Sequence, residues 1–220
     1  MPQKPLYATA VEDYVKVIYA HTEWQPEPIT TSVLAGRLGL AASSVTEMVK
    51  KLGVQGLVDH VPYGAVILTP DGTALALRMV RRHRLIETWL AGQFGYGWHE
   101  VHDEAEVLEH ALSDRLLDSI DEQLGFPTRD PHGDPIPSRD GRVEQPAAVL
   151  LRRIGMGETV RVVRISDRDP ALLRRLEAES ITLDREFTVE SVEPFAVRLR
   201  DGRSAVALAH DCLDSVWVGR

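Results

Sequence analysis

The sequence lacks most of the features that mark secreted or membrane proteins. Its 220 residues include one cysteine, Cys212, so no disulfide can form within the chain, which fits a reducing compartment. No run approaches the roughly 18 uninterrupted apolar residues of a membrane span, and the first residues lack the apolar core of a signal peptide. We therefore expect a cytoplasmic protein with no membrane partner.

Positive charge is also scarce. The 25 Lys and Arg residues are outnumbered by 33 Asp and Glu residues, and the net charge of −8 by itself argues against a nucleic-acid partner. The charge is uneven: the net charge is −1 over residues 1–70, −7 over residues 71–141 and zero over residues 142–220. A local excess of acid is what a cation site requires, although a solvated acidic surface is the commoner meaning of such a run.

Hydrophobic residues make up 44% of the chain, which is ordinary for a globular protein of this length. Apolar residues recur at helical spacing up to about residue 124, and residues 125–146 are rich in Pro, Gly and Asp. Short β-branched runs follow, with one helical stretch between them. The predicted fold class is therefore mainly α, with a small C-terminal β-barrel.

The run VLAGRLGLAASSVTEMVKKL predicts two short helices joined by a turn, and a hairpin around Pro62-Tyr63-Gly64 follows it, the winged helix-turn-helix pattern. Thr30 or Thr31 is expected to cap the first helix, and Ser43 or Ser44 the second, with Ser44 and Glu47 spaced as a capping box. The second helix would enter the major groove. The expected contacts to bases or phosphates are Ser43, Ser44, Thr46, Glu47, Lys50, Lys51 and, at the wing tip, Tyr63. A winged helix that binds only protein is the alternative.

The stretch HDEAEVLEH, residues 102–110, gathers acidic and imidazole side chains. On a helix predicted over Trp98–Ser113, an arc of about 120° would hold five of them at about 100° per residue. These five are His102, Asp103, Glu106, Glu109 and His110, whereas Glu104 falls on the far side. Carboxylates and imidazoles without thiols favour Mn²⁺ or Fe²⁺ over structural Zn²⁺, although Zn²⁺, Co²⁺ and Ni²⁺ also fit.

Other segments repeat this chemistry. His83 and Glu87 are four residues apart on a predicted helix, and Asp130 and His132 lie in the loop DPHGDP. Asp13 adds a carboxylate on the first helix. A surface hydrogen bond or a simple turn explains each pair alone, but together they predict a metal site built from several segments.

Enzyme motifs are missing. The chain has no HExxH, nucleophile elbow, P-loop or GxGxxG, so no catalytic residue and no small organic substrate are expected. The alternative is a metalloenzyme or a metal-storage module with an incidental helix-turn-helix.

Several motifs occur together: VEDYVKVIY, SSVTEMVKKL, YGAVILTPDG, MVRRHRLIE, EVHDEAEVLEH and GDPIP. In these the chain resembles the diphtheria toxin repressor family of metal-dependent transcriptional repressors, and its manganese-responsive branch in particular. The resemblance covers nearly the whole chain. It implies a homodimer that binds double-stranded operator DNA and represses metal-uptake genes, with the metal as corepressor. The implied domains are a winged helix-turn-helix at 1–72, a helical dimerisation and metal-binding domain at 73–146, and an SH3-like (FeoA-like) module at 147–220.

The resemblance also implies the ligands. The primary site would use Asp13, Glu106, Glu109 and His110. Carboxylates at 13 and 106 stand where iron-responsive members have methionine and cysteine, so Mn(II) is the expected metal and Fe(II) the alternative.

The ancillary site is open between two arrangements. The iron-type arrangement would use His83, Glu87 and His102. The streptococcal manganese-type arrangement would use Asp130, His132 and a carboxylate of the third module, for which Asp167 fits best and Asp169 is the other candidate. Two positions depart from relatives: Lys16 replaces a glutamate ligand of one single-domain manganese regulator, and Asp130 replaces a cysteine of streptococcal members.

Overall fold

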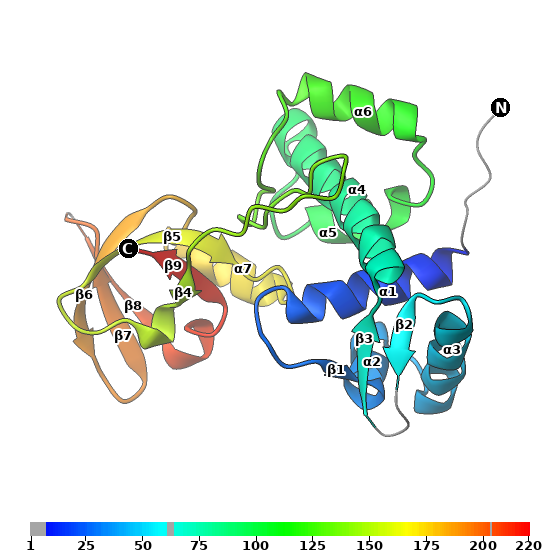
Figure 1. Ribbon diagram of the computed structural model, residues 1–220. Coiled ribbons are helices and arrows are strands. Elements are labelled where there is room, and N and C mark those ends of the chain that lie inside the picture. Colours follow the sequence, from blue (N-terminus) through cyan, green and yellow to red (C-terminus); the bar gives the residue numbers. More distant parts are fainter. Residues whose placement is uncertain (1–7, 61–63, 203) are drawn as a thin grey trace. The chain divides into compact units, whose positions relative to one another are not determined.

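The computed structural model describes residues 8–60, 64–202 and 204–220 (Figure 1). Its contacts divide the chain into two compact units. The first unit comprises residues 1–83, 109–117 and 137–142, and the second comprises residues 84–108, 118–136 and 143–220. Each is considered by itself. Among the described residues, no helix combines the length and the apolar character that crossing a bilayer requires.

The first unit contains a three-helix bundle with a small sheet, and Figure 1 shows these elements together in blue and cyan. Its elements are α1 (Thr9–Thr22), β1 (Ile29–Thr30), α2 (Thr31–Leu38), α3 (Ala42–Val54), β2 (Val58–His60) and β3 (Ala65–Leu68). Strand β3 pairs antiparallel with both β1 and β2. One apolar core, which includes Val15, Leu34, Val49 and Val66, joins these helices to the sheet. The predicted winged helix-turn-helix is confirmed.

The ends of the two short helices test the predicted caps. The Thr30 side chain accepts a hydrogen bond from the Val33 N–H at 3.3 Å, and Gly39 ends α2 with a left-handed φ of 64°, both as expected. The cap predicted for α3 is wrong. Ala41 stands at the N-cap without a side-chain bond, Ser43 and Ser44 lie inside the first turn, and Glu47 pairs with Lys50 at 2.9 Å.

Three further helices follow: α4 (Pro70–Phe94), α5 (Val101–Leu108) and α6 (Asp114–Gln123). The helix predicted over Trp98–Ser113 is shorter than expected, because α5 ends before Glu109 and His110. The Arg82 Nε donates to the Glu109 carbonyl at 2.8 Å, and the Arg82 guanidinium also contacts the Leu112 carbonyl. A side chain therefore takes carbonyls that a continued helix would bond internally. The single arc expected for the ligands does not extend to Glu109 and His110.

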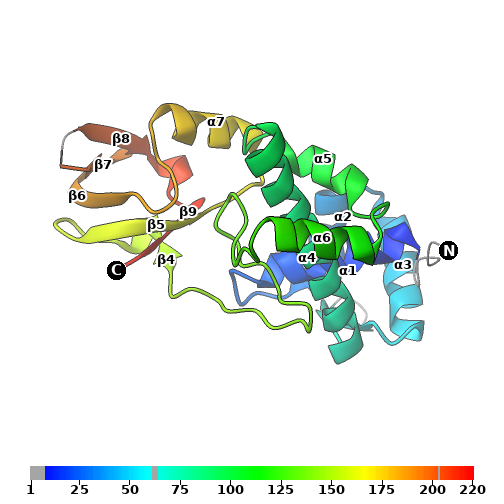
Figure 2. The same cartoon turned by 90° about the horizontal axis from the view of Figure 1, so that it is seen from above.

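The C-terminal part of the second unit is a six-stranded antiparallel sheet with one helix (Figure 2). Its elements are β4 (Val149–Leu150), β5 (Thr159–Ile165), α7 (Pro170–Ala178), β6 (Glu186–Val192), β7 (Ala196–Arg200), β8 (Ala205–Ala209) and β9 (Val216–Gly219), with short 3₁₀ turns at Leu151–Arg153 and His210–Cys212. Buried side chains from the strands and from Leu173 and Leu176 of α7 form one core.

The strand order in this sheet is β4-β9-β5-β6-β7-β8. Within the described residues β4 and β8 are its edges and do not pair with each other, so the closed barrel that the sequence predicted is not shown. Before the sheet, residues 124–148 have no regular element apart from one bridge between Arg129 and Pro135, as their composition predicted.

Candidate metal centres

The first group of possible ligands lies in the first unit. Asp13 comes from α1, and Glu109 and His110 come from the turn after α5. One ligand atom from each lies within 4.8 Å of the others, and we refer to this group as the Asp13 centre. The His110 Nε2 lies 2.9 Å from the Asp13 Oδ1 and 3.3 Å from the Glu109 Oε1. Two carboxylates and an imidazole therefore converge on one point.

Glu109 is the most deeply buried member of this centre, with no exposed surface. Its Oε2 lies 2.6 Å from the His83 Nδ1, and its Oε1 lies 2.5 Å from the Lys16 Nζ. Burial alone would raise the pKa of Glu109, but the hydrogen bond and charge of His83, together with Lys16, lower it below its ordinary value. Glu109 is therefore an ionised carboxylate, which is the form that a metal ion needs.

Glu12, which the sequence reasoning passed over, supports this centre. The Glu12 Oε2 lies 2.9 Å from the His110 Nδ1, on the opposite side of the ring from Asp13. A carboxylate behind a ligating imidazole fixes the ring and its tautomer. The only sequence signal was position, because Glu12 adjoins Asp13 on a helix that was already assigned to the site.

The second group lies in the second unit, and we refer to it as the His132 centre. Its members are Glu87 on α4, His132 in the loop after α6, and Asp167 just after β5, again with ligand atoms within 4.8 Å of one another. The His132 Nδ1 lies 3.9 Å from the Glu87 Oε2. The His102 Nδ1 lies 3.5 Å from Glu87 and 3.7 Å from Asp167, so a second imidazole borders the group.

The His132 ring is oriented for a cation. Its Nε2 lies 2.7 Å from the Trp98 carbonyl and donates to it, so in the neutral ring the Nδ1 carries a lone pair. That Nδ1 is buried and has no hydrogen-bond partner within the described part of the chain. Burial lowers the pKa of His132, but the charges of Asp130, Glu87 and Asp167 outweigh this effect and raise it overall. A lone pair that faces carboxylates is stabilised by a bound proton or metal ion. The ligand atoms of the His132 centre therefore fit a divalent cation.

Asp130, a predicted ligand, is engaged in the loop itself. Its Oδ1 accepts the backbone N–H groups of His132 at 2.8 Å and Asp134 at 2.9 Å. Burial, with the nearby charges of Asp134 and Glu87, raises the pKa of Asp130 to about 7. The structure does not place Asp130 in the His132 centre, and its role as a ligand stays a prediction.

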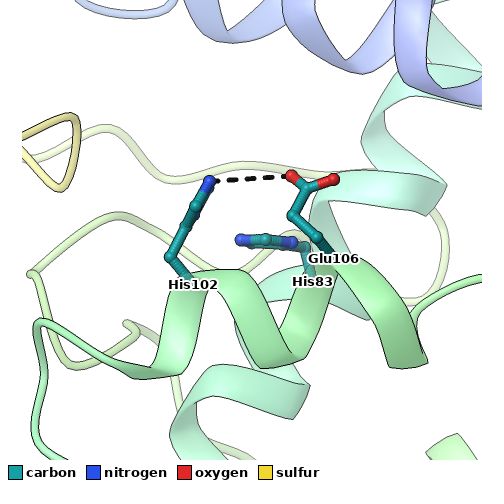
Figure 3. A group of neighbouring side chains, drawn as sticks. All are labelled: His83, His102 and Glu106. Atoms are coloured by element: carbon teal, nitrogen blue, oxygen red, sulfur yellow. Dashed lines mark ion pairs between the residues drawn. The ribbon is translucent and has the colours of Figure 1, made fainter.

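The remaining predicted ligands are His102, Glu106 and His83. On α5 the His102 Nε2 lies 3.7 Å from the Glu106 Oε1, one helical turn away, and Figure 3 shows these two side chains facing each other. Both are partly exposed. His83, also labelled in Figure 3, belongs to the first unit, where it bonds Glu109. Glu106 belongs to the second unit, so its place among the primary ligands stays a prediction from the resemblance.

A buried ionic network holds the loop of the His132 centre, and the sequence reasoning missed it. The Arg164 Nε donates to the Asp134 Oδ1 at 2.7 Å, and Arg84 lies 3.5 Å from the same carboxylate. The Ile165 N–H donates to the His132 carbonyl at 2.9 Å. These contacts fix the loop against β5, which ends two residues before Asp167. The signal that could have found Arg164 is its position in a run of buried β-type residues.

The predicted DNA contacts lie on one helix. Ser43, Ser44, Glu47, Lys50 and Lys51 are exposed along α3, and Thr46 is half-buried with its Oγ1 donating to the Ala42 carbonyl at 2.8 Å. Tyr63 lies outside the described residues.

A winged helix-turn-helix together with two His/carboxylate groups defines a class of protein, the DNA-binding proteins that can hold metal ions. Comparison with known families gives a match for each of the three parts of the chain. Residues 7–66 match the family "Iron dependent repressor, N-terminal DNA binding domain" and residues 69–138 the family "Iron dependent repressor, metal binding and dimerisation domain". Residues 149–220 match the FeoA domain.

Individual relatives cover most of the chain. The diphtheria toxin repressor of Corynebacterium glutamicum is 32% identical over 163 residues, 71% of each chain. The iron-dependent repressor IdeR of Mycobacterium tuberculosis is 30% identical over 223 residues, 94% of this chain and 95% of IdeR. Among solved structures, a manganese-dependent transcriptional repressor in complex with manganese is 47% identical, with a TM-score of 0.91 over 95% of this chain and 99% of that one.

The chain therefore belongs to the diphtheria toxin repressor family of iron-dependent repressors. It is a metal-dependent DNA-binding transcriptional repressor. It has the three parts of that architecture, a winged helix-turn-helix, a helical metal-binding and dimerisation domain, and an SH3-like FeoA domain.

Proposed function

We propose that Mn(II) is the metal that activates this repressor, and that it controls genes of manganese uptake. One observation carries the proposal. The Asp13 centre brings two carboxylates and one imidazole within 4.8 Å, without a sulfur ligand. Hard oxygen ligands favour Mn²⁺, whereas softer sulfur ligands favour later metals. The likeness to a solved manganese-dependent repressor at 47% identity supports the same metal.

We propose the Asp13 centre as the primary site and the His132 centre as the ancillary site. A cation bound at the first would be held by Asp13, Glu109 and His110, whose ligand atoms lie within 4.8 Å of one another. Glu109 contributes an ionised carboxylate without exposed surface, and Glu12 orients the His110 ring. At the second, Trp98 orients His132 so that its Nδ1 faces Glu87. Glu106, Asp130, His83 and His102 remain candidates for further ligands.

The coupling to DNA follows from where Asp13 lies. It stands on α1, whose apolar face packs in the same core as α2 and α3. Joining Asp13 to Glu109 and His110 restrains α1 and with it the helix-turn-helix. In a dimer, the two α3 helices must match successive major-groove turns about 34 Å apart. A ligand that binds better to the DNA-competent arrangement shifts the population toward it.

The partners proposed are a second copy of the chain and double-stranded operator DNA. The family match to a dimerisation domain supports the homodimer. Large apolar side chains of the second unit, Phe94 at 59% exposure and Val107 at 71%, offer surface that a second copy would cover. We propose no catalytic role for any residue. The residues assigned above are proposed to bind a cation or DNA.

A binding experiment tests the metal. A DNA site would be selected from a random-sequence pool with Mn²⁺ present, and its affinity measured by fluorescence anisotropy with chelator, Mn²⁺ or anaerobic Fe²⁺. We expect tight binding with Mn²⁺ and weak binding with chelator. Affinity that does not change with any metal would overturn the proposal.

An iron-responsive repressor is the second candidate, supported by the 30% identity to IdeR. The two candidates differ in their response to the double variant Asp13→Met/Glu106→Cys. If Mn(II) is the native activator, this variant should respond better to Fe²⁺ than to Mn²⁺, reversing the wild-type order. A wild-type protein that already prefers Fe²⁺ at equal free concentration would favour the iron reading.

A further inference from the structure

A lysine lies inside the Asp13 centre. The Lys16 Nζ lies 2.5 Å from the Glu109 Oε1, across 93 residues of sequence, and both side chains are buried. Lys16 follows Asp13 by three residues on α1, so the two residues share a face of that helix. A buried ammonium group is uncommon unless it is paired, because its desolvation is costly.

Lysine is rare in this chain, which makes its position informative. The sequence has four lysines, at positions 4, 16, 50 and 51, against 21 arginines. Lys50 and Lys51 are exposed on α3, whereas Lys16 is 8% exposed. Its flexible stem carries a compact charge to one carboxylate oxygen, where a planar guanidinium would need more space.

We propose that Lys16 is a resident cation of the Asp13 centre, which competes with the divalent metal for Glu109 and so sets the metal concentration at which the repressor responds. The proposal rests on the proposed function. It adds a residue that is not a ligand and that acts on the ligand Glu109 in the metal-free state.

The electrostatics of the centre carry this inference. In the metal-free protein His83 and the Lys16 ammonium together offset the charge of the fully buried Glu109 carboxylate, His83 at its Oε2 and Lys16 at its Oε1. A metal ligated by the Glu109 Oε1 must take that oxygen from Lys16 and then share the site with its positive charge. Both effects stabilise the metal-free state relative to the bound state. Lys16 therefore lowers metal affinity.

Calorimetry on matched variants tests the inference. Mn²⁺ affinity would be measured in a His132→Ala background, which leaves the Asp13 centre as the site observed. Lys16→Gln and Lys16→Met remove the charge, Lys16→Arg keeps it, and Arg115→Gln removes an exposed charge elsewhere in the first unit. We expect the two neutral variants to bind Mn²⁺ about tenfold more tightly, as expected for the loss of one charge-assisted hydrogen bond in the metal-free state. Lys16→Arg keeps the positive charge and should gain less affinity than either neutral variant, and Arg115→Gln should stay within about twofold of the parent.

A spectroscopic readout follows the lysine itself. With four lysines, a protein labelled with ¹³Cε-lysine gives few signals, and the one missing from the charge-retaining variant Lys16→Arg belongs to Lys16. Adding diamagnetic Cd²⁺ should shift that signal more than those of Lys50 and Lys51. This measurement uses the wild-type chain, so it holds even where a neutral variant fails to fold by circular dichroism.

The outcomes separate the two proposals. A wild-type protein whose DNA affinity ignores every metal overturns the proposed function. A metal-responsive wild type whose Lys16 signal stays fixed while Cd²⁺ binds overturns the role of Lys16 alone. Folded neutral variants that bind Mn²⁺ no more tightly than the parent overturn it as well.

Discussion

The Nε2 of His110 lies 2.9 Å from the Oδ1 of Asp13, although 97 positions separate these residues in the sequence. The contact joins the first helix of the DNA-binding part to the turn after α5. Both residues are candidate ligands of the Asp13 centre.

Replacing Asp13 should therefore separate metal binding from folding. We expect Asp13→Asn to weaken Mn²⁺ binding at the Asp13 centre by at least about tenfold, since an amide is a poorer ligand for a hard cation than a carboxylate. Metal-induced DNA binding should fall with it. Glu27→Gln, which neutralises an exposed carboxylate of the same unit, is the matched control. Equal Mn²⁺ affinity in the two variants would contradict the assignment.

The two centres should bind metal separately. Calorimetry on His132→Ala should show the loss of one class of Mn²⁺ site, while the class removed by Asp13→Asn remains. The reason is that the His132 Nδ1 is buried and, among the described residues, has no hydrogen-bond partner that would compete with a metal ion. If His132→Ala removed both classes, or neither, the division into two centres would be wrong.

The stability of the metal-free protein should depend on pH through His132 and Asp130. The pKa of His132 is raised above its ordinary value of 6.5 in the folded state. The protonated ring therefore adds to the free energy of unfolding below pH 6.5, and this stabilisation is lost as pH rises through the folded pKa. The pKa of Asp130 is raised from 3.8 to about 7 in the folded state. Between these pH values the folded state keeps a proton that the unfolded state has lost, so the free energy of unfolding falls as pH rises. Both groups act in the same direction.

Urea unfolding with chelator at about pH 5.5 to 8 measures this trend as the free energy of unfolding. It should decrease with pH, and Asp130→Asn should flatten the decrease, because the amide oxygen can still accept both backbone N–H groups. Mn²⁺ affinity at the His132 centre should rise over the same range, since the metal needs the neutral imidazole. A wild-type curve that is flat or rising would count against this account.

The buried pair of Arg164 and Asp134 should be important for stability. Its side chains are 6% and 4% exposed, and Arg164 also stacks over the Trp217 ring at 4.2 Å. Arg164→Met leaves a buried carboxylate without this partner and should cost about 3–5 kcal/mol of unfolding free energy. The control is Arg161→Met, whose pair with Glu186 is more than half exposed and should cost under about 1 kcal/mol. Similar losses of unfolding free energy in both variants would show that burial does not determine how much an ion pair stabilises this protein.

Periodicity and turn residues predicted most of the fold. Apolar spacing located α1 to α4, and the alternation in TVRVVRI located β5. An element that is buried on one face repeats apolar residues at the period of its own geometry, and this period is visible in the sequence. The predicted cap of α3 was wrong because Ser43 and Ser44 fit the capping pattern, whereas the helix already begins at Ala42. The end of α5 was missed because the residue that bonds the Glu109 carbonyl just beyond it, Arg82, lies on another helix.

The candidate centres were predictable only in part. Residue chemistry identified their members, since His and carboxylate clusters are visible in sequence. Which members meet depends on tertiary contacts: the group of Glu87, His132 and Asp167 combines residues that the sequence had divided between two arrangements. Lys16 was noted as a departure from a relative, but its bond to Glu109 could not be inferred from either segment.

The hydrogen bond from His132 to the Trp98 carbonyl affects which substitutions the His132 centre can tolerate. The acceptor is a backbone atom, which every residue possesses, so the choice of imidazole tautomer is independent of the side chain at position 98. Substitutions there can remove the ring that stacks near His132, with centroids 6.3 Å apart, and still leave the Nδ1 directed at the carboxylates. A one-residue insertion between Trp98 and α5 could abolish it. The tautomer of this imidazole is therefore specified by the path of the chain, and sequences that differ at position 98 can share it.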